Sequence, residues 1–280
     1  MMRSFSIQLL DKEKGITSFQ ALSPLKREMK GVKVGHAGTL DRFASGMIVA
    51  LTGGATKLNP IFSSFDKEYI ASIRFGEETD TLDPEGNVIA SAALPSQESV
   101  RAVLPSFLGR QMQTPPVYSA IHVDGKRAYK EARKGKDVEM PEREIEVSSI
   151  LLLSQSDDEA VIRVSVSKGT YIRALARDIA RACGSCGYLT DLRRIRTGPW
   201  QLSDSGKDSI ELLSMTGLLS TVVLSERERI AVENGTITRR AVLSDSDSTL
   251  PYCFLFFGSE LFGIGEKTDG RYRILSRLDR

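Results

Sequence analysis

The sequence predicts a chain of mixed α and β structure with a smaller, β-rich part at its C-terminus. Residues 67–76 alternate between apolar and polar side chains, which is typical of a half-buried strand. Residues 172–180 instead place their apolar side chains on one face of a helix. Residues 252–257, 260–265 and 271–276 form three short strand-like runs with Gly or polar turns between them. A chain of 280 residues is long enough for a large domain followed by a small one.

Composition excludes several classes of protein. Apolar residues make up 41% of the chain and charged residues 26%, an ordinary globular mixture. The sequence contains no apolar run of about 18 residues and no recognisable signal peptide, so we expect a cytoplasmic protein that spans no membrane. The net charge of +2 is too small to decide for or against a nucleic-acid partner.

The cysteines do not indicate a disulfide framework or a metal site. Cys183 and Cys186 form a C-x-x-C pair, but a zinc site needs two further ligands. The remaining candidates, Cys253, His36 and His122, are not at metal-like spacing. We therefore interpret the pair as structural and expect no metal.

The N-terminal segment predicts a strand and then a helix. Residues 5–10 alternate and then become apolar, as an opening strand does. Thr17 or Ser18 can cap a helix that runs toward Lys30. Pro24 lies inside this span, so the helix either restarts with Ser23 as its cap or kinks there.

The next segment, residues 35–46, places one carboxylate on a Gly-rich loop. Its sequence is Gly-His-Ala-Gly-Thr-Leu-Asp-Arg-Phe-Ala-Ser-Gly, with Asp41 as its only acid. Gly35, Gly38 and Gly46 permit tight turns and the close approach of another backbone. Asp41 can cap a turn, or it can serve as a nucleophile or base in a cleft, and the loop alone leaves both open.

Two further strands and a turn follow this loop. Residues 47–51 are continuously apolar and predict a buried strand. In the strand at 67–76, Tyr69 shares a face with apolar residues, so a core tyrosine is the simpler interpretation. Residues 76–86 are rich in turn-forming residues, and their Asp and Thr side chains are expected to organise the loop by local hydrogen bonds. Residues 96–109 predict a short amphipathic helix.

Two basic segments suggest a polyanionic partner. Residues 126–136 contain six bases and one acid, a local charge of +5, with Tyr129 among them. Residues 143–153 and 160–167 predict two strands that lead into the helix at 172–180. Residues 163–196, which we call the basic stripe, contain eight bases and two acids, a local charge of +6. Basic segments are usually solvated faces, but beside a site they also suit nucleic acid. Residues 203–225 indicate a capped helix and a connector.

Three well-separated motifs resemble those of the TruB family of tRNA pseudouridine synthases. They are the loop at 35–46, the segment Ser-Lys-Gly-Thr-Tyr-Ile-Arg at 167–173, and Leu-Arg-Arg-Ile-Arg-Thr-Gly-Pro-Trp at 192–200. The resemblance covers nearly all of residues 5–200. The chain departs from the family pattern at Arg42 and Glu13, where proline is usual, and losing Pro frees the backbone after Asp41.

The resemblance implies a fold and an activity. The fold is the α+β pseudouridine synthase fold, with a mixed, mainly antiparallel sheet flanked by helices and a small β-rich, PUA-like RNA-binding domain. We expect residues 1–224 to form the catalytic domain and residues 225–280 the small one. The activity is isomerisation of uridine 55 in the TΨC loop of tRNA, on a base flipped out of its stack. The expected partner is the tRNA TΨC stem-loop, bound by a monomer that needs no cofactor.

The resemblance also implies residue roles. Asp41 is the catalytic carboxylate, acting at the sugar C1′, at the base C6 or through a glycal route. Tyr69 stacks on the uracil, and its hydroxyl can move a proton. Arg173 holds Asp41 ionised, as a guanidinium can. The expected substrate-binding residues are His36, which fills the space left by the base, Tyr171 beside the base, Leu192 in the pocket wall, and Lys12, which supports the loop.

Two other functions stay open on the sequence alone. One is a non-catalytic tRNA-binding or tRNA-folding protein on the same scaffold, against which the intact Asp41, Tyr69 and Arg173 argue. The other is a small-molecule hydrolase, which needs a second acid in the same cleft. The sequence offers no convincing second acid.

Overall fold

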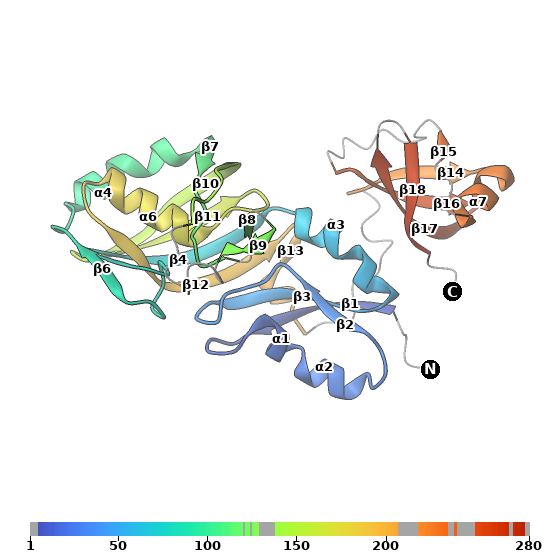
Figure 1. Cartoon of the computed structure of the whole chain (residues 1–280), viewed down its shortest axis with the longest axis horizontal. Coiled ribbons are helices and arrows are strands. Elements are labelled where there is room, and N and C mark those ends of the chain that lie inside the picture. The colour runs from blue at the N-terminus through green and yellow to red at the C-terminus, as the bar shows by residue number, and fades with distance from the viewer. Residues whose placement is uncertain are drawn as a thin grey trace.

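The computed structural model describes residues 5–119, 121–123, 125–128, 138–206, 218–234, 238–239, 250–268 and 271–277. A large sheet occupies the N-terminal and central part of the chain, and a smaller sheet lies at the C-terminal end (Figure 1). The large sheet has nine strands, of which seven follow one another as neighbours. In that order they are β1 (Phe5–Lys12), β3 (Ser45–Gly53), β12 (Gly187–Thr197), β4 (Lys67–Phe75), β11 (Glu159–Val166), β10 (Arg143–Gln155) and β7 (Gly109–Gln113).

The large sheet is mixed and mainly antiparallel, as the resemblance implied. Two short strands complete it: β2 (Val34–Ala37) pairs with β3, and β13 (Trp200–Gln201) pairs with β12. Among the strands described for this sheet, the contact between β12 and β3 is the parallel one, where Arg193 and Arg194 lie beside Ser45 and Gly46. Two separate hairpins are formed by β5 (Glu77–Thr79) with β6 (Val88–Ser91) and by β8 (His122–Val123) with β9 (Lys126–Arg127).

The helices are short, and most lie between strands of the large sheet. They are α1 (Ser18–Ala21), α2 (Ser23–Glu28), η1 (Gly54–Leu58), α3 (Asn59–Ser64), α4 (Gln97–Val103), η2 (Leu104–Phe107), α6 (Ile172–Ala182), η3 (Leu202–Asp204) and α7 (Glu226–Glu233). Both predicted helices of the central part are present, the first as α4 followed by η2. α4 and α6 lie together over one face of the sheet (Figure 1).

The predicted helix from residue 17 to residue 30 is two helices. Thr17 caps α1, and a capping box joins it to Gln20. α2 then restarts with Pro24 in its first turn, where a missing N–H costs nothing. Ser23 is not its cap, because Leu22 holds that position without a side-chain hydrogen bond.

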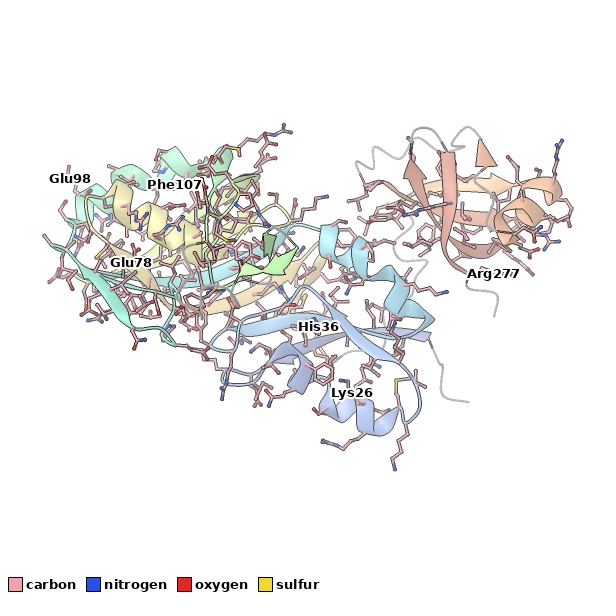
Figure 2. All side chains as sticks on the ribbon, in the orientation of Figure 1. Lys26, His36, Glu78, Glu98, Phe107 and Arg277 are labelled. Atoms are coloured by element: carbon pink, nitrogen blue, oxygen red, sulfur yellow. The ribbon has the colours of Figure 1, made fainter. Side chains whose placement is uncertain are left out.

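The main core lies between the large sheet and α6. Its buried side chains include Ile73 of β4, Leu189 of β12, and Leu175 and Ile179 of α6. Phe107 of η2, labelled in Figure 2, closes the end of this core. Burying one such side chain stabilises the fold by about 1.5–3 kcal/mol, so the sheet and α6 are held together firmly.

A smaller sheet forms the C-terminal part of the chain. Its order is β14 (Ser220–Leu224), β16 (Tyr252–Phe257), β17 (Glu260–Thr268), β18 (Arg271–Arg277) and β15 (Thr238–Arg239). The three predicted strands are therefore present. β14 precedes residue 225, so the small sheet begins within residues 203–225, which were expected to form a capped helix and a connector. Residues 207–217 of that segment lie outside the described residues.

The two sheets share a second core. Ile7 of β1, Met47 of β3 and Phe62 of α3 pack in one buried cluster with Tyr252 and Phe254 of the small sheet. Trp200 joins this cluster, with its ring 5.5 Å from that of Phe62. The small sheet is thus connected to the large one through apolar side chains and not only through the chain.

Candidate active site

A cavity of about 560 Å³ opens beside the central strands of the large sheet. Its wall is assembled from the loop at 38–42, β4, residues 81–85, residues 118–119, the segment 166–173 and β12. Cavities of about 300–1,000 Å³ are typical of small-molecule sites. Five of the expected site residues line it: Asp41, Tyr69, Tyr171, Arg173 and Leu192.

The loop that carries Asp41 depends on two of its glycines. Gly38 has φ +72° and Gly46 has φ +103°, values that L side chains rarely adopt. A Cβ added to Gly46 would lie 2.2 Å from the carbonyl oxygen of Arg194, on the strand that runs parallel to β3. The predicted close approach of another backbone is therefore present at Gly46. Gly35 does not have a positive φ, and a Cβ added to it would have no neighbouring atom closer than 3.7 Å.

Buried polar side chains hold both ends of this loop. The Ser18 hydroxyl accepts the Leu40 N–H at 2.9 Å and donates to the Leu40 carbonyl at 3.0 Å, which fixes the residue before Asp41. The Lys12 ammonium donates to the carbonyl oxygens of Ala44 at 2.6 Å and Arg42 at 3.4 Å on the other side. It also donates to Ile16 and Glu13. Lys12 is 1% exposed and does not line the cavity, and its ammonium is directed at the backbone of the loop.

Arg42, where the family pattern has proline, adds a further link. Its Nε donates to the Gly15 carbonyl at 2.7 Å, and the Gly15 N–H donates to the Arg42 carbonyl at 2.9 Å. This exchange ties the loop to the turn after β1. The Arg42 side chain therefore restrains the backbone after Asp41, at the position where the usual family pattern has a proline ring.

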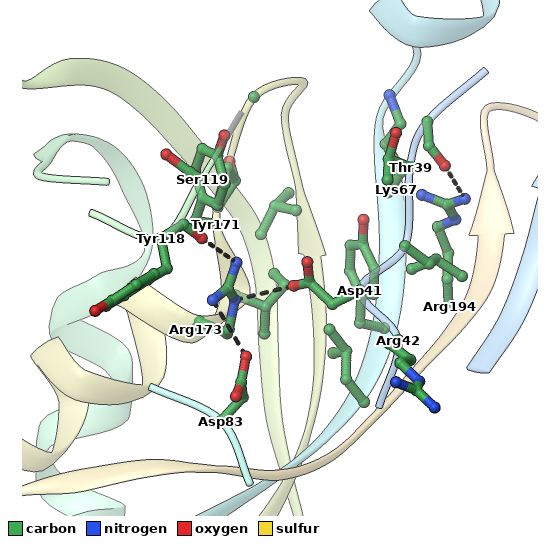
Figure 3. Close-up of a pocket in the computed structure, with 18 of the residues that line it drawn as sticks. Thr39, Asp41, Arg42, Lys67, Asp83, Tyr118, Ser119, Tyr171, Arg173 and Arg194 are labelled. Carbon is green, nitrogen blue, oxygen red and sulfur yellow. Dashed lines mark hydrogen bonds and ion pairs between the residues drawn. The ribbon is translucent and has the colours of Figure 1, made fainter. Parts of the chain in front are cut away.

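Asp41 faces Arg173 across the cavity floor (Figure 3). The Arg173 Nε lies 2.9 Å from the Asp41 Oδ2, although its N–H is not aligned for a hydrogen bond. Burial raises the pKa of the Asp41 carboxyl, the Arg173 guanidinium lowers it, and the net change is upward. The free-energy cost of removing the Asp41 carboxylate from water is larger here than the stabilisation that one adjacent cation provides. Asp41 is thus ionisable, reachable from the cavity and poorly solvated.

Arg173 is itself fixed by the fold. It is 5% exposed and lies in the first turn of α6. Its Nη1 donates to the Thr81 carbonyl at 2.7 Å and to the Asp83 Oδ2 at 3.2 Å, and its Nη2 donates to the Tyr118 carbonyl at 3.1 Å. The guanidinium is therefore pre-positioned before any substrate arrives.

Asp83 is a site residue that sequence reasoning placed only in a loop. It is 4% exposed and forms an ion pair with Arg173 on the side away from Asp41 (Figure 3). Its Oδ1 accepts the Thr81 hydroxyl at 2.6 Å and the Glu85 N–H at 3.0 Å, the local hydrogen bonds that were predicted. The turn also holds Leu82 at φ +59°, a strained conformation for a leucine. Nothing in the spacing indicated that Asp83 reaches α6.

Two aromatic rings and a leucine complete the wall. Tyr69 is buried on β4, and Leu192 is buried on β12. Tyr171 precedes α6, and Gln113 of β7 fixes its backbone by accepting its N–H at 2.9 Å and donating to its carbonyl at 3.1 Å. The Arg143 guanidinium lies 5.4 Å from the centroid of the Tyr171 ring. A flat, apolar ring fits between such walls.

The positions of His36 and Lys67 differ from what the sequence analysis expected. His36 lies half-buried on β2 and does not line the cavity. Burial and then the charges of Arg194 and Lys26 lower the pKa of its imidazole. Lys67, which the sequence analysis did not single out, lines the cavity with its ammonium bonded to the carbonyls of Ser63 and Phe65. Burial, followed by the Arg194 charge, lowers the pKa of Lys67 to about 8.

The arginines of the basic stripe form ion pairs and hydrogen bonds within the fold. Each of its seven arginines has a partner, and six of them pair with acids: Arg163 and Arg196 with Glu68, Arg173 with Asp41 and Asp83, Arg177 with Asp178, Arg181 with Glu78, and Arg193 with Asp11. The seventh, Arg194, donates to the carbonyls of Met47 and Gly38 at 2.6 Å each. The eighth base of the stripe, Lys168, is exposed, and the suggestion that the stripe meets nucleic acid stays a prediction. Residues 129–136 of the other basic segment lie outside the described residues.

In the part of the chain that the structure describes, no three His, Cys, Asp or Glu side chains lie together in a way that could hold a metal ion. No described helix is both long enough and apolar enough to cross a membrane.

Comparison with known proteins identifies close relatives. Residues 26–172 match the family model described as TruB family pseudouridylate synthase (N terminal domain). The tRNA pseudouridine synthase B of Borreliella burgdorferi is 43% identical over 232 residues, which cover 82% of this chain and 82% of that protein. The protein of the same name from Caulobacter vibrioides is 41% identical over 218 residues, covering 77% and 70% respectively.

Solved structures support the fold. A crystal structure of the archaeal box H/ACA sRNP Nop10–Cbf5 complex contains a chain similar to this one with a TM-score of 0.68. The identity is 20%, and the match covers 98% of this chain and 86% of that chain. At this level of identity the likeness is one of fold, and it extends over both sheets.

Proposed function

The chain belongs to the TruB family of pseudouridylate synthases, and we propose that it converts uridine 55 in the TΨC loop of tRNA to pseudouridine. The observation that supports this most directly is the ion pair of Asp41 and Arg173 on the floor of a nucleotide-sized cavity. The relatives at 41–43% identity carry the name tRNA pseudouridine synthase B, which favours tRNA as the substrate.

The reaction breaks the bond between N1 of uracil and C1′ of ribose and forms a bond from C1′ to C5 of the same base. A stacked base cannot turn over between these two steps, so the nucleotide must be flipped into the cavity. Tyr69 and Tyr171 would then offer flat faces to the uracil, and Leu192 would close the wall behind it. These side chains are already in place, which lowers the entropy lost on binding.

Asp41 is the proposed catalytic carboxylate. Ionised, it can attack C1′ as a nucleophile, attack C6 of the base, or take a proton on a glycal route. Carboxylate attack at an anomeric carbon is the chemistry of retaining glycosidases. Arg173 keeps this carboxylate ionised and aimed, while Asp83 on its other side stops the guanidinium from turning away.

The remaining roles follow from position. The Tyr69 hydroxyl can relay a proton to or from the base. His36 lies on the strand before the loop and would reach the space that the base vacates only when RNA is bound. Lys12 acts through the loop that it holds. We also propose that the small C-terminal sheet is a PUA-like RNA-binding domain, with its boundary before β14.

The decisive test is Asp41→Asn on an unmodified tRNA transcript. We expect pseudouridine formation to fall by at least about 10³-fold, because the amide can neither attack nor accept a proton, while tRNA affinity stays within a few-fold. The matched control is Asp11→Asn, which removes a carboxylate paired with Arg193 and outside the cavity lining.

Three outcomes are informative. Retained activity in Asp41→Asn would remove Asp41 from the mechanism. Binding of tRNA by the wild-type protein without any pseudouridine would favour a tRNA-binding or tRNA-folding protein. Modification of a tRNA in which uridine 55 is replaced by cytidine would show that another position is the target.

A further inference from the structure

Four basic side chains surround the end of α2 and the turn that leads into β2. They are Lys26, Arg27, Lys30 and Lys33, and we call them the α2 basic surface. Lys26 is half-buried, and the other three are exposed. Glu28 is the only acid between residues 17 and 40, so four bases less one acid leave this segment with a charge of +3.

The bases of the α2 basic surface are not paired with acids. Among the residues that the structure describes, none of the four forms an ion pair with an Asp or Glu. The Lys26 ammonium instead lies over the ring of Phe19, which is 65% exposed on α1. Unpaired cations beside an exposed aromatic ring are the combination by which proteins hold single-stranded RNA.

The position of this surface connects it to the active site. β2 begins directly after Lys33, and the strand leads through His36 to the loop that carries Asp41. Lys26 lies close enough to His36 for its charge to help lower the pKa of that imidazole, after burial and Arg194 (Figure 2). Leu25 of α2 and Leu40 of the loop that lines the cavity belong to one buried cluster, so α2 and that loop pack on the same core.

We propose that the α2 basic surface binds phosphates of the substrate RNA that flank the flipped nucleotide. This inference rests on the proposed function for the identity of the RNA. It assigns the electrostatic contribution to the α2 basic surface, whose bases have no acidic partner among the described residues, and not to the arginines of the basic stripe, which already have partners.

The test compares the wild-type protein with the triple variant Lys26→Gln, Arg27→Gln and Lys30→Gln. Affinity for an unmodified tRNA transcript is measured over a range of salt concentrations. Each lost phosphate contact reduces the slope of log affinity against log salt by about 0.7–0.9, so we expect a total reduction of about 2. Affinity at physiological salt should fall about tenfold, since each contact contributes only a few-fold. KM should rise by a similar factor while kcat at saturating tRNA stays unchanged.

A matched triple variant removes the same charge elsewhere. Arg101 and Arg110 are exposed and Arg74 is half-buried, and replacing all three with Gln should change neither affinity nor slope by more than about twofold. The pair Lys30→Gln and Lys33→Gln lies outside α2 and keeps the test valid if the first variant folds poorly; it should lose part of the slope.

The outcomes separate this proposal from the proposed function. If the wild-type protein makes pseudouridine and both α2 variants bind tRNA with wild-type affinity and salt slope, the α2 proposal is overturned and the function stands. If the wild-type protein makes no pseudouridine, the proposed function fails, and the salt slope of tRNA binding still decides the α2 proposal. A weaker slope in the α2 variants but not in the matched variant supports it.

Discussion

The basic stripe and the α2 basic surface look alike in sequence and differ in the folded chain. The stripe has the larger local charge, +6 against +3. In the structure, however, every arginine of the stripe is bonded to an acid or a backbone carbonyl. The four bases of the α2 surface have no acidic partner among the described residues. The segment with the smaller local charge, the α2 basic surface, is therefore the one whose bases have no acidic partner and can bind an anionic ligand.

The difference follows from where the two segments lie. The stripe runs along β11, α6 and β12, which are central to the large sheet and meet acids from distant parts of the chain, such as Asp11 and Glu68. α2 packs one apolar side chain, Leu25, and turns its bases to solvent. A guanidinium in the interior needs hydrogen-bond partners, whereas one at the surface does not. Positive charge in a core segment therefore serves the fold and the site.

The largest expected effect comes from breaking the stripe at Arg173. Arg173→Gln should lower kcat/KM by about 10³-fold, because the amide carries no charge to hold Asp41 ionised. Asp41 must be ionised to act, so activity is lost as pH falls through its already raised pKa. Without Arg173 only the more weakly acting Lys12 charge opposes the effect of burial, so the pKa of Asp41 rises further and the acid limb of the pH–rate profile moves to higher pH.

The conservative variant separates charge from shape. Arg173→Lys keeps the positive charge but cannot reach Thr81, Tyr118 and Asp83 together. We expect its acid limb to stay near that of the wild-type protein while kcat remains low. An unchanged pH profile in Arg173→Gln would show that Arg173 does not control the ionisation of Asp41. Binding of tRNA by both variants should be within a few-fold of wild type.

A smaller effect is expected at Glu68, which joins two arginines of the stripe. Burial raises the pKa of this carboxyl, but hydrogen bonds from Arg196 and Arg163 outweigh it, and the pKa is lowered. Glu68→Gln should reduce the free energy of unfolding at pH 7 by about 2 kcal/mol, since one guanidinium group loses its acceptor and both lose the negative charge. A carboxyl with a lowered pKa stabilises the fold fully above its ordinary value of 4.5 and loses that contribution as pH falls through the lowered value.

Urea unfolding at several pH values measures this effect. The difference between the wild-type protein and Glu68→Gln should shrink below about pH 4.5. The control is Glu144→Gln, an exposed acid paired with Arg110, which should change stability by less than about 0.5 kcal/mol. Equal effects of the two substitutions would show that the Glu68 cluster is no stronger than a surface pair.

The comparison also shows which parts of the molecule can be predicted from the sequence. Alternation and turn residues predicted β4, β10 and β11, because a period of two depends only on neighbouring side chains. The motif at 167–173 placed Arg173 near Asp41, and the ion pair is present. Asp83 and Glu68 were missed as partners because their contacts span 90 and 128 residues of chain. Pairing at that separation is set by sheet order, which local patterns do not encode.

The smallest expected effect comes from replacing arginines of the basic stripe that are partly exposed to solvent. Arg181 and Arg193 are its partly exposed members and pair with Glu78 and Asp11. If a paired arginine contributes nothing to RNA binding, Arg181→Gln with Arg193→Gln should leave tRNA affinity within about twofold and the salt slope unchanged, since the paired acids already neutralise the lost charges. If the same double variant instead lost slope as the α2 variants do, the pairs would be opening to meet phosphate. Charge counted along the sequence would then be a better guide to the RNA surface than charge left over after folding.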